Sequence, residues 1–417
     1  MPYASNVRTL PAARGGRMVQ LDVLRGVAIL LVLCRHPVLP WSFAGPLQPV
    51  VLRLYHLGWT GVDLFFVLSG FLIGGLLFDE IRRTNRLDVK RFLIRRAFKI
   101  WPAYLVFIAY VFALLAWQHH SAWYALHEVS PNLIHLQNYL HTEGGVARGH
   151  TWSLAVEEHF YLALPLFLLA VIGRRRRPGA PIPAIGVAAV ALIVLCTGLR
   201  LLVNPYPPFD WWHIIAPTHM RIDGLFFGVL LAYVYHFHPR RLAGFARHPW
   251  ALIFAGLILI LPMAIVDQGD RPFVWTIGLT MLYLGYGCIL VAFVHAQPGR
   301  GLLGKAIASR VAAVVAGIGV FSYSIYLWQM EPAGLLRFWL DRHPPLHHLS
   351  LCWLVTTLTY IAGSIVLGVV LSKVIEMPVL ALRDRNFPRA PRAVLTPARP
   401  ARASSTPEMR GSTPVKG

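Results

Sequence analysis

Long apolar runs, separated by short polar segments, recur along almost the whole of this chain. Each run is close to the roughly 20 residues that an α-helix needs to cross a bilayer. Only 14% of the residues are charged, whereas soluble domains carry about 25%. The sequence therefore predicts an all-α, polytopic membrane helical bundle of about 10 transmembrane helices, near residues 21–40, 56–79, 98–117, 152–172, 182–203, 218–237, 249–267, 273–296, 311–331 and 351–377.

The distribution of Lys and Arg orients these spans. Both residue types gather before the first span, in alternate loops and after the last span, and they are sparse in the other loops. Because cytoplasmic loops carry the excess of Lys and Arg, we expect both termini in the cytoplasm. The net charge of +21 comes mostly from these loops. It therefore predicts the lipid bilayer, and no nucleic acid, as a partner.

Composition divides the chain into three parts. Residues 1–20 are predicted to be a cytoplasmic N-terminal segment and residues 21–378 the membrane domain. Residues 379–417 are predicted to form a disordered basic cytoplasmic tail, because they are rich in Pro, Ala, Arg, Ser and Thr. The four cysteines fall within apolar runs without paired spacing, and the histidines of the loop 118–150 match no ligand pattern. We expect no metal site.

Arg25 and His36 stand eleven residues apart in the first apolar run. At about 100° per residue, eleven steps return to nearly the same face of a helix, and the rise between them is about 16 Å. An arginine near one membrane face would then be aligned with a titratable imidazole deeper in. Ionisable groups inside a membrane are costly, so the pair is a functional hypothesis.

Other polar residues fall at two depths of the predicted spans. An inner, cytoplasmic layer would contain Arg25, Arg91, Arg95, Arg96 and Lys99. An outer layer would contain His36, Asp63, Trp152, Ser153, Glu157, Glu158, Arg221, Asp223, Tyr323 and Gln329. Each also has an ordinary structural explanation: basic side chains snorkel to the interface, tyrosines form interfacial belts, and amides bond neighbouring helices. The shared depth favours a functional site.

Glu157 and Glu158 are the hardest of these residues to explain as structural. Adjacent residues on a helix point about 100° apart, so the two carboxylates cannot both hide on one face. At least one of them is expected to face a cavity or a cation. Arg221 is a natural partner for it.

Six motifs, taken together and in order, resemble the acyltransferase-3 family of integral membrane O-acyltransferases, which includes bacterial O-antigen acetylases. They are LDVLRG at 21–26, GVDLFFVLSGF at 61–71, RRAFKIWPAY at 95–104, TWSLAVEEHFY at 151–161, RIDG at 221–224 and YSIYLW at 323–328. The chain departs from the family at Gln329, where members often carry His, and at His159, where Gln is frequent. Some members add an esterase-like domain after the last span. Only a short tail follows Pro378 here, so we expect transfer by the membrane domain alone or with a separate partner.

The resemblance implies an acyl-CoA donor, commonly acetyl-CoA, that arrives from the cytoplasm as co-substrate, with no tightly bound cofactor. The phosphates of coenzyme A suit the inner cations, since arginine binds phosphate in a bidentate manner. The pantetheine arm would carry the thioester toward His36. The predicted substrate-binding residues are Arg25, Arg95, Arg96, Lys99, Trp152, Ser153, Glu158, Arg221, Asp223, Tyr323 and Gln329.

On this interpretation His36 is the general base, or relays the acyl group as an acyl-imidazole. Asp63 or Glu157 would orient the imidazole as the third member of a triad does. Arg221 or Trp152 would face the developing oxyanion.

The acceptor stays open: a glycan, a lipid-linked sugar or a secondary metabolite would fit. The family's setting implies a multi-pass protein of the bacterial inner membrane. Buried His, Arg and carboxylate groups also describe a proton-coupled transporter, although carriers usually contain internal repeats and none is evident here. A membrane sensor or scaffold, and transfer to an amine, are further alternatives.

Overall fold

The computed structural model describes residues 18–36, 38–140, 149–173, 181–203, 211–266, 271–343 and 349–387. The described residues form helices and no strand, which confirms the predicted all-α bundle. The first helices are α1 (Val19–Cys34), the 3-10 helix η1 (Trp41–Leu47), α2 (Gln48–Gly58), α3 (Gly61–Thr84), α4 (Val89–His119), α5 (Ala122–Leu133), α6 (Trp152–Ile172) and α7 (Pro183–Val203). They are followed by α8 (Trp211–Ile214), α9 (Thr218–Phe237), α10 (Pro239–Phe245), α11 (Pro249–Ile265), the π-helical turn η3 (Val274–Gly278), α12 (Leu279–His295), α13 (Gly301–Ile307), α14 (Arg310–Val320), α15 (Ser322–Trp328), α16 (Met330–Arg342), α17 (Leu349–Leu371), the π-helical turn η4 (Ser372–Glu376) and α18 (Met377–Asn386).

Within these residues, 7 helical segments are long and apolar enough to cross a membrane, and two bent helix pairs raise the number to at most 9. The bent pairs are α10 with α11, at 79°, and α13 with α14, at 57°. The protein is therefore multi-pass, but the predicted ten spans are not all found. The helix α1 has 16 residues, fewer than the roughly 20 that span a bilayer. The predicted span 311–331 is divided between α14 and α15.

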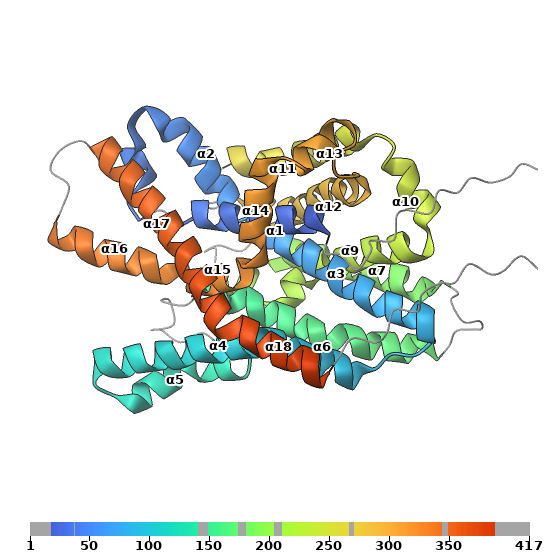
Figure 1. The fold of residues 1–417 in the computed structure, drawn as a ribbon, viewed down its shortest axis with the longest axis horizontal. Coiled ribbons are helices and arrows are strands. Elements are labelled where there is room, and N and C mark those ends of the chain that lie inside the picture. The colour runs from blue at the N-terminus through green and yellow to red at the C-terminus, as the bar shows by residue number, and fades with distance from the viewer. Residues whose placement is uncertain are drawn as a thin grey trace, which may run out of the picture.

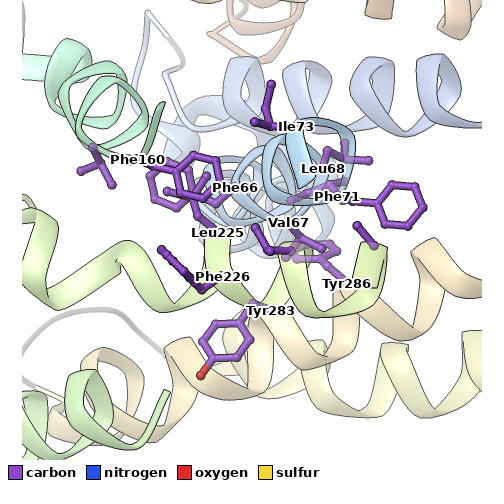
Figure 2. Packing of buried hydrophobic residues seen from close by; sticks show 14 of the residues in the cluster. Phe66, Val67, Leu68, Phe71, Ile73, Phe160, Leu225, Phe226, Tyr283 and Tyr286 are labelled. Carbon is purple, nitrogen blue, oxygen red and sulfur yellow. The ribbon is translucent and has the colours of Figure 1, made fainter. Parts of the chain in front are cut away.

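The helices α3 and α9 cross at a point where two glycines meet. A Cβ atom on Gly70 would lie 1.9 Å from the carbonyl oxygen of Leu225, and one on Gly228 would lie 2.3 Å from that of Val67. No other residue fits at this distance, so the backbones approach as closely as small residues permit. Figure 2 shows the buried side chains that surround the crossing, among them Phe66, Val67, Phe71, Leu225 and Phe226.

Two buried ion pairs hold α9 to its neighbours. Arg221 Nη2 lies 2.8 Å from Asp63 Oδ1 on α3, and Arg200 Nη2 on α7 lies 2.7 Å from Asp223 Oδ2. All four side chains are at most 4% exposed. Since removing one member would leave an uncompensated buried charge, these pairs fix how α3, α7 and α9 fit together.

The helix α1 lies inside the bundle, against α14, α3 and α15 (Figure 1). Its contact with α14 again depends on glycine. A Cβ on Gly26 would lie 2.1 Å from the Val315 carbonyl oxygen, and one on Gly319 would lie 2.0 Å from that of Asp22. This contact fixes the height and rotation of the helix turn that carries Arg25.

Along one edge of the molecule α18 lies beside α4, and α4 beside α6 (Figure 1). The chain stays helical to Asn386, so the last helix extends into the segment that the sequence assigned to the tail. Residues 388–417 lie outside the described residues. Disorder of the tail, like the cytoplasmic location of both termini, stays a prediction.

Candidate active site

Two cavities, which we call the inner and the outer cavity, share a wall in the middle of the bundle. Their empty volumes, counting space open to solvent, are about 890 Å³ and about 810 Å³. The inner cavity is lined by Arg25, Val62, Phe65, Phe66, Ser69, Arg96, Lys99, Ile100, Ser153, Leu154, Glu157, Glu158, Tyr161, Val320, Ser322, Tyr323 and Tyr326. The outer cavity is lined by Val32, Arg35, His36, Trp59, Val62, Gly149, His150, Trp152, Trp211, Trp212, Ile215, Arg221, Tyr326, Gln329 and Met330. Only Val62 and Tyr326 occur in both sets.

Three predicted cations meet in the inner cavity. Arg25 comes from α1, while Arg96 and Lys99 come from one face of α4. The Lys99 ammonium lies 2.8 Å from Glu376, which is 3% exposed and also accepts a hydrogen bond from Ser324. This pairing holds the lysine in place at the cavity wall.

Arg95, in contrast, does not line either cavity. It donates to the Phe387 carbonyl, and its Nη2 lies 2.9 Å from Asp384 Oδ1. Both partners follow the last π-helical turn, so this arginine fastens α18 to α4.

Tyr323 of α15 does line the inner cavity. Its hydroxyl donates to the Ile100 carbonyl at 3.0 Å.

Glu157 and Glu158 line the inner cavity, beside the cations. Ser69 Oγ and the Tyr161 hydroxyl donate to the Glu157 carboxylate at 2.8 Å and 2.7 Å. The indole of Trp101 lies 3.4 Å from Glu158 Oε2. The two carboxylates thus face a cavity, as predicted. They line a different cavity from His36, and the membrane depth that the sequence assigns to all three residues stays a prediction.

His36 lines the outer cavity, at the end of the first helix and not within it. Because α1 ends at Cys34, the helical spacing that would align His36 with Arg25 does not reach it. The ring nitrogen Nδ1 lies 3.1 Å from the Val32 carbonyl oxygen. Since a carbonyl can only accept, Nδ1 carries the proton, and Nε2 of the neutral ring keeps its lone pair.

Asp63 and Asp223, both predicted site residues, line neither cavity in the described part of the chain. Asp63 binds Arg221, and Asp223 binds Arg200. The sequence predicted a glutamate as the partner of Arg221, and the structure gives an aspartate instead. Arg221 does line the outer cavity. Arg200 was not among the residues predicted from the sequence. An arginine alone inside the apolar run 182–203 was the signal that could have identified it.

Tryptophan rings make one wall of the outer cavity. The lining residues Trp152 and Trp211 meet edge to face with ring centroids 6.2 Å apart. The ring of Trp275, which is only 2% exposed, packs against two of these rings. Its centroid lies 5.8 Å from that of Trp211 and 5.1 Å from that of Trp59. Only Trp152 was singled out from sequence, because tryptophans near span ends are expected in any membrane protein.

Gln329 and Ser153 complete the set of predicted residues. Gln329 is fully buried at the outer cavity, and its side-chain oxygen accepts from the Tyr360 hydroxyl at 3.4 Å. Ser153 lines the inner cavity, with its Oγ 2.7 Å from the Tyr326 hydroxyl. The site thus has an inner region of cations and carboxylates and an outer region of aromatic rings, two imidazoles and two arginines. The first suits an anionic ligand that carries several hydrogen-bonding groups, and the second can hold a ring and take up a proton.

Comparisons with known proteins identify similar acetyltransferases. The chain is 27% identical over 333 residues to the peptidoglycan O-acetyltransferase OatA of Listeria monocytogenes, covering 74% of this chain and 48% of the relative. It is also 27% identical over 331 residues to YrhL of Bacillus subtilis, provisionally named a peptidoglycan O-acetyltransferase, covering 74% of this chain and 47% of that protein. The chain thus spans about half the length of these curated relatives. No solved structure matches it.

The family comparison covers most of the chain. The model of an acyltransferase domain matches residues 18–375, a range that includes both cavities and every predicted site residue. The protein therefore belongs to the acyltransferase-3 family of integral membrane proteins, and residues 18–375 match its acyltransferase domain.

Proposed function

We propose that this protein is an O-acyltransferase of the bacterial inner membrane. It would take an acyl group, acetyl in the commonest case, from cytoplasmic acyl-CoA and transfer it to a hydroxyl group of a glycan. The observation that carries the proposal is the pair of adjoining cavities with different chemistry: one combines three cations with two carboxylates, and the other combines tryptophan rings with two histidines and two arginines.

The inner cavity is the proposed donor site. Coenzyme A carries several phosphate charges, and charge-assisted hydrogen bonds from arginine to phosphate are among the strongest that proteins make. Arg25, Arg96 and Lys99 would bind these phosphates at the cytoplasmic mouth. The flexible pantetheine arm would then extend along the apolar lining, which includes Phe65 and Ile100, toward the shared wall.

The outer cavity is the proposed acceptor site. Aromatic rings present flat apolar faces that suit the C–H face of a sugar ring, and Trp152, Trp211 and Trp212 line this cavity. The names of two relatives, which refer to peptidoglycan, agree with a glycan acceptor. Lipid-linked sugars belong to the same chemical class.

His36 is the proposed general base. With its Nδ1 proton donated to Val32, Nε2 can accept the proton of the acceptor hydroxyl as its oxygen attacks the thioester carbonyl. The new C–O bond forms, the C–S bond breaks, and the thiolate of coenzyme A takes up the proton from His36. A relay through an acyl-imidazole uses the same nitrogen. Asp63 would support the site indirectly, because its ion pair holds Arg221 at the outer cavity.

The test is acyl transfer by the purified protein in proteoliposomes. [14C]Acetyl-CoA is supplied on one side and a soluble glycan fragment on the other, and label on the glycan is measured. The proposal predicts label on hydroxyl groups with the wild-type protein and none with His36→Ala. If an unmodified solute and protons cross the membrane together while no label is transferred, the protein is a proton-coupled transporter and the proposal is wrong.

A further inference from the structure

Tyr326 stands between the two cavities. It is one of the two residues that line both, and the other, Val62, offers only a small side chain. The tyrosine is 6% exposed. Its ring meets the edge of Phe65, from the inner cavity, with centroids 6.4 Å apart, and the ring of His150, from the outer cavity, at 5.6 Å. Its bulk therefore forms most of the wall that separates the cavities.

The hydroxyl group of Tyr326 is held from both sides of this wall. It donates to the carbonyl oxygen of His150 at 2.6 Å and lies 2.7 Å from Ser153 Oγ. Ser153 lines the inner cavity and His150 the outer one. Two short hydrogen bonds on one buried hydroxyl restrict the side chain to one rotamer. The wall is thus fixed by bonds to both halves of the site.

The backbone that carries Tyr326 is also held. At the neighbouring residue Ile325, α15 touches α17 so closely that a Cβ on Gly368 would lie 2.6 Å from the Ile325 Cα. Since α15 cannot move away from α17 without losing this contact, the backbone also keeps the Tyr326 ring in the wall between the cavities.

We propose that Tyr326 is a positioning residue that keeps the acyl thioester apart from water in the outer cavity. This inference rests on the proposed function. The thioester, entering from the inner cavity, would meet His36 only past the phenol ring, where the glycan hydroxyl displaces water. Without the ring, water would attack the same carbonyl: its oxygen bonds to the acyl carbon, the C–S bond breaks, and acetate and coenzyme A leave. Tyr326 would thus determine the ratio of acyl transfer to hydrolysis.

The experiment measures two products from [14C]acetyl-CoA with the full-length protein in proteoliposomes, labelled glycan and labelled acetate, in the presence and absence of a glycan fragment. For Tyr326→Ala we expect the ratio of transfer to hydrolysis to fall about tenfold or more. Tyr326→Phe, which keeps the ring and loses both hydrogen bonds, should lower the ratio by a smaller factor. A purely structural role would lower both products together and leave the ratio unchanged.

Tyr233→Phe is the matched control. This tyrosine is also 6% exposed, lies on α9 and lines neither cavity. Should Tyr326→Ala fail to fold, Ser153→Ala removes one of the two hydrogen bonds, and the same direction of change is required of it. If the wild type transfers acetyl and all the Tyr326 and Ser153 variants keep its product ratio, the inference is wrong while the proposed function stands. If the wild type itself makes no labelled glycan, both are overturned.

Discussion

The inner and the outer cavity adjoin but are built differently. The inner cavity joins three cations to two carboxylates, and several of these groups have polar partners in the protein, such as Lys99 with Glu376 and Glu157 with Ser69. The outer cavity is lined by tryptophan rings, two histidines and two arginines, of which Arg221 is paired with Asp63, and among its described lining residues there is no carboxylate. A charged donor at the inner cavity and a ring-shaped acceptor at the outer cavity would match this division. Each cavity should therefore respond to different substitutions and different substrates.

The largest effect is expected at His36. Loss of a general base lowers turnover by about 10²- to 10⁴-fold, so His36→Gln should lose transfer to that extent. Because this residue lies in the outer cavity only, binding of acyl-CoA should be unchanged, which equilibrium dialysis with labelled acetyl-CoA measures. His236→Gln, on α9 and outside both cavities, is the control. Weakened acyl-CoA binding in His36→Gln would contradict the division between the cavities.

Arg221 provides the next largest effect, and it concerns stability. Although this arginine lines the outer cavity, it is bound to the buried Asp63. In Arg221→Ala the carboxylate stays buried without its countercharge, at a cost of about 3–5 kcal/mol. The free energy of unfolding in mixed micelles should fall by this amount. In Asp63→Leu/Arg221→Met, which removes both charges, much of the loss should be recovered.

Arg95→Ala serves as the comparison for Arg221. Its partner Asp384 is 52% exposed, and exposed pairs contribute only about 0–1 kcal/mol. Equal destabilisation by the two substitutions would mean that the Arg221 pair does not fix α9 to α3.

Much of this architecture could be predicted from the sequence, and the reasons for the remainder are specific. Apolar runs identified the membrane segments, and the polar residues Arg25, His36 and Glu157, singled out within them, each line one of the two cavities. Periodicity along one helix, however, does not say at what height two helices cross. Contacts such as Gly70 with Leu225 and Gly26 with Val315 decide that.

The misplaced residues illustrate the point. Asp63 was a candidate partner of His36, but the crossing of α3 and α9 brings it to Arg221. Glu157 was the other candidate partner, but it lines the cavity with the cations because α6 faces α4 and α3 there. Local sequence also does not reveal that the first helix ends at Cys34, before His36.

Arg25 tests the donor half of the comparison. A charge-assisted hydrogen bond to phosphate contributes about 1.5–3 kcal/mol, so Arg25→Ala should raise the KM for acetyl-CoA about tenfold or more. With S-acetylpantetheine, a donor that lacks the nucleotide phosphates, the substitution should have little effect. The control is Arg95→Ala, since Arg95 lies outside the cavity. An equal rise in KM for both donors would show that Arg25 maintains the structure of the site and does not bind phosphate.

The smallest effect is expected at the tryptophan wall, where Trp211 lies between Trp152 and the buried Trp275. Stacking of one aromatic ring contributes about 0.5–1.5 kcal/mol beyond its buried area. Trp211→Ala should therefore raise the KM for the glycan fragment several-fold and leave the KM for acetyl-CoA unchanged, with both measured from initial rates of label transfer. Trp123→Ala, at a ring that is 79% exposed on α5, should change neither. Because Trp211 lines only the outer cavity, a rise confined to the acetyl-CoA KM would reverse the assignment of donor and acceptor to the two cavities.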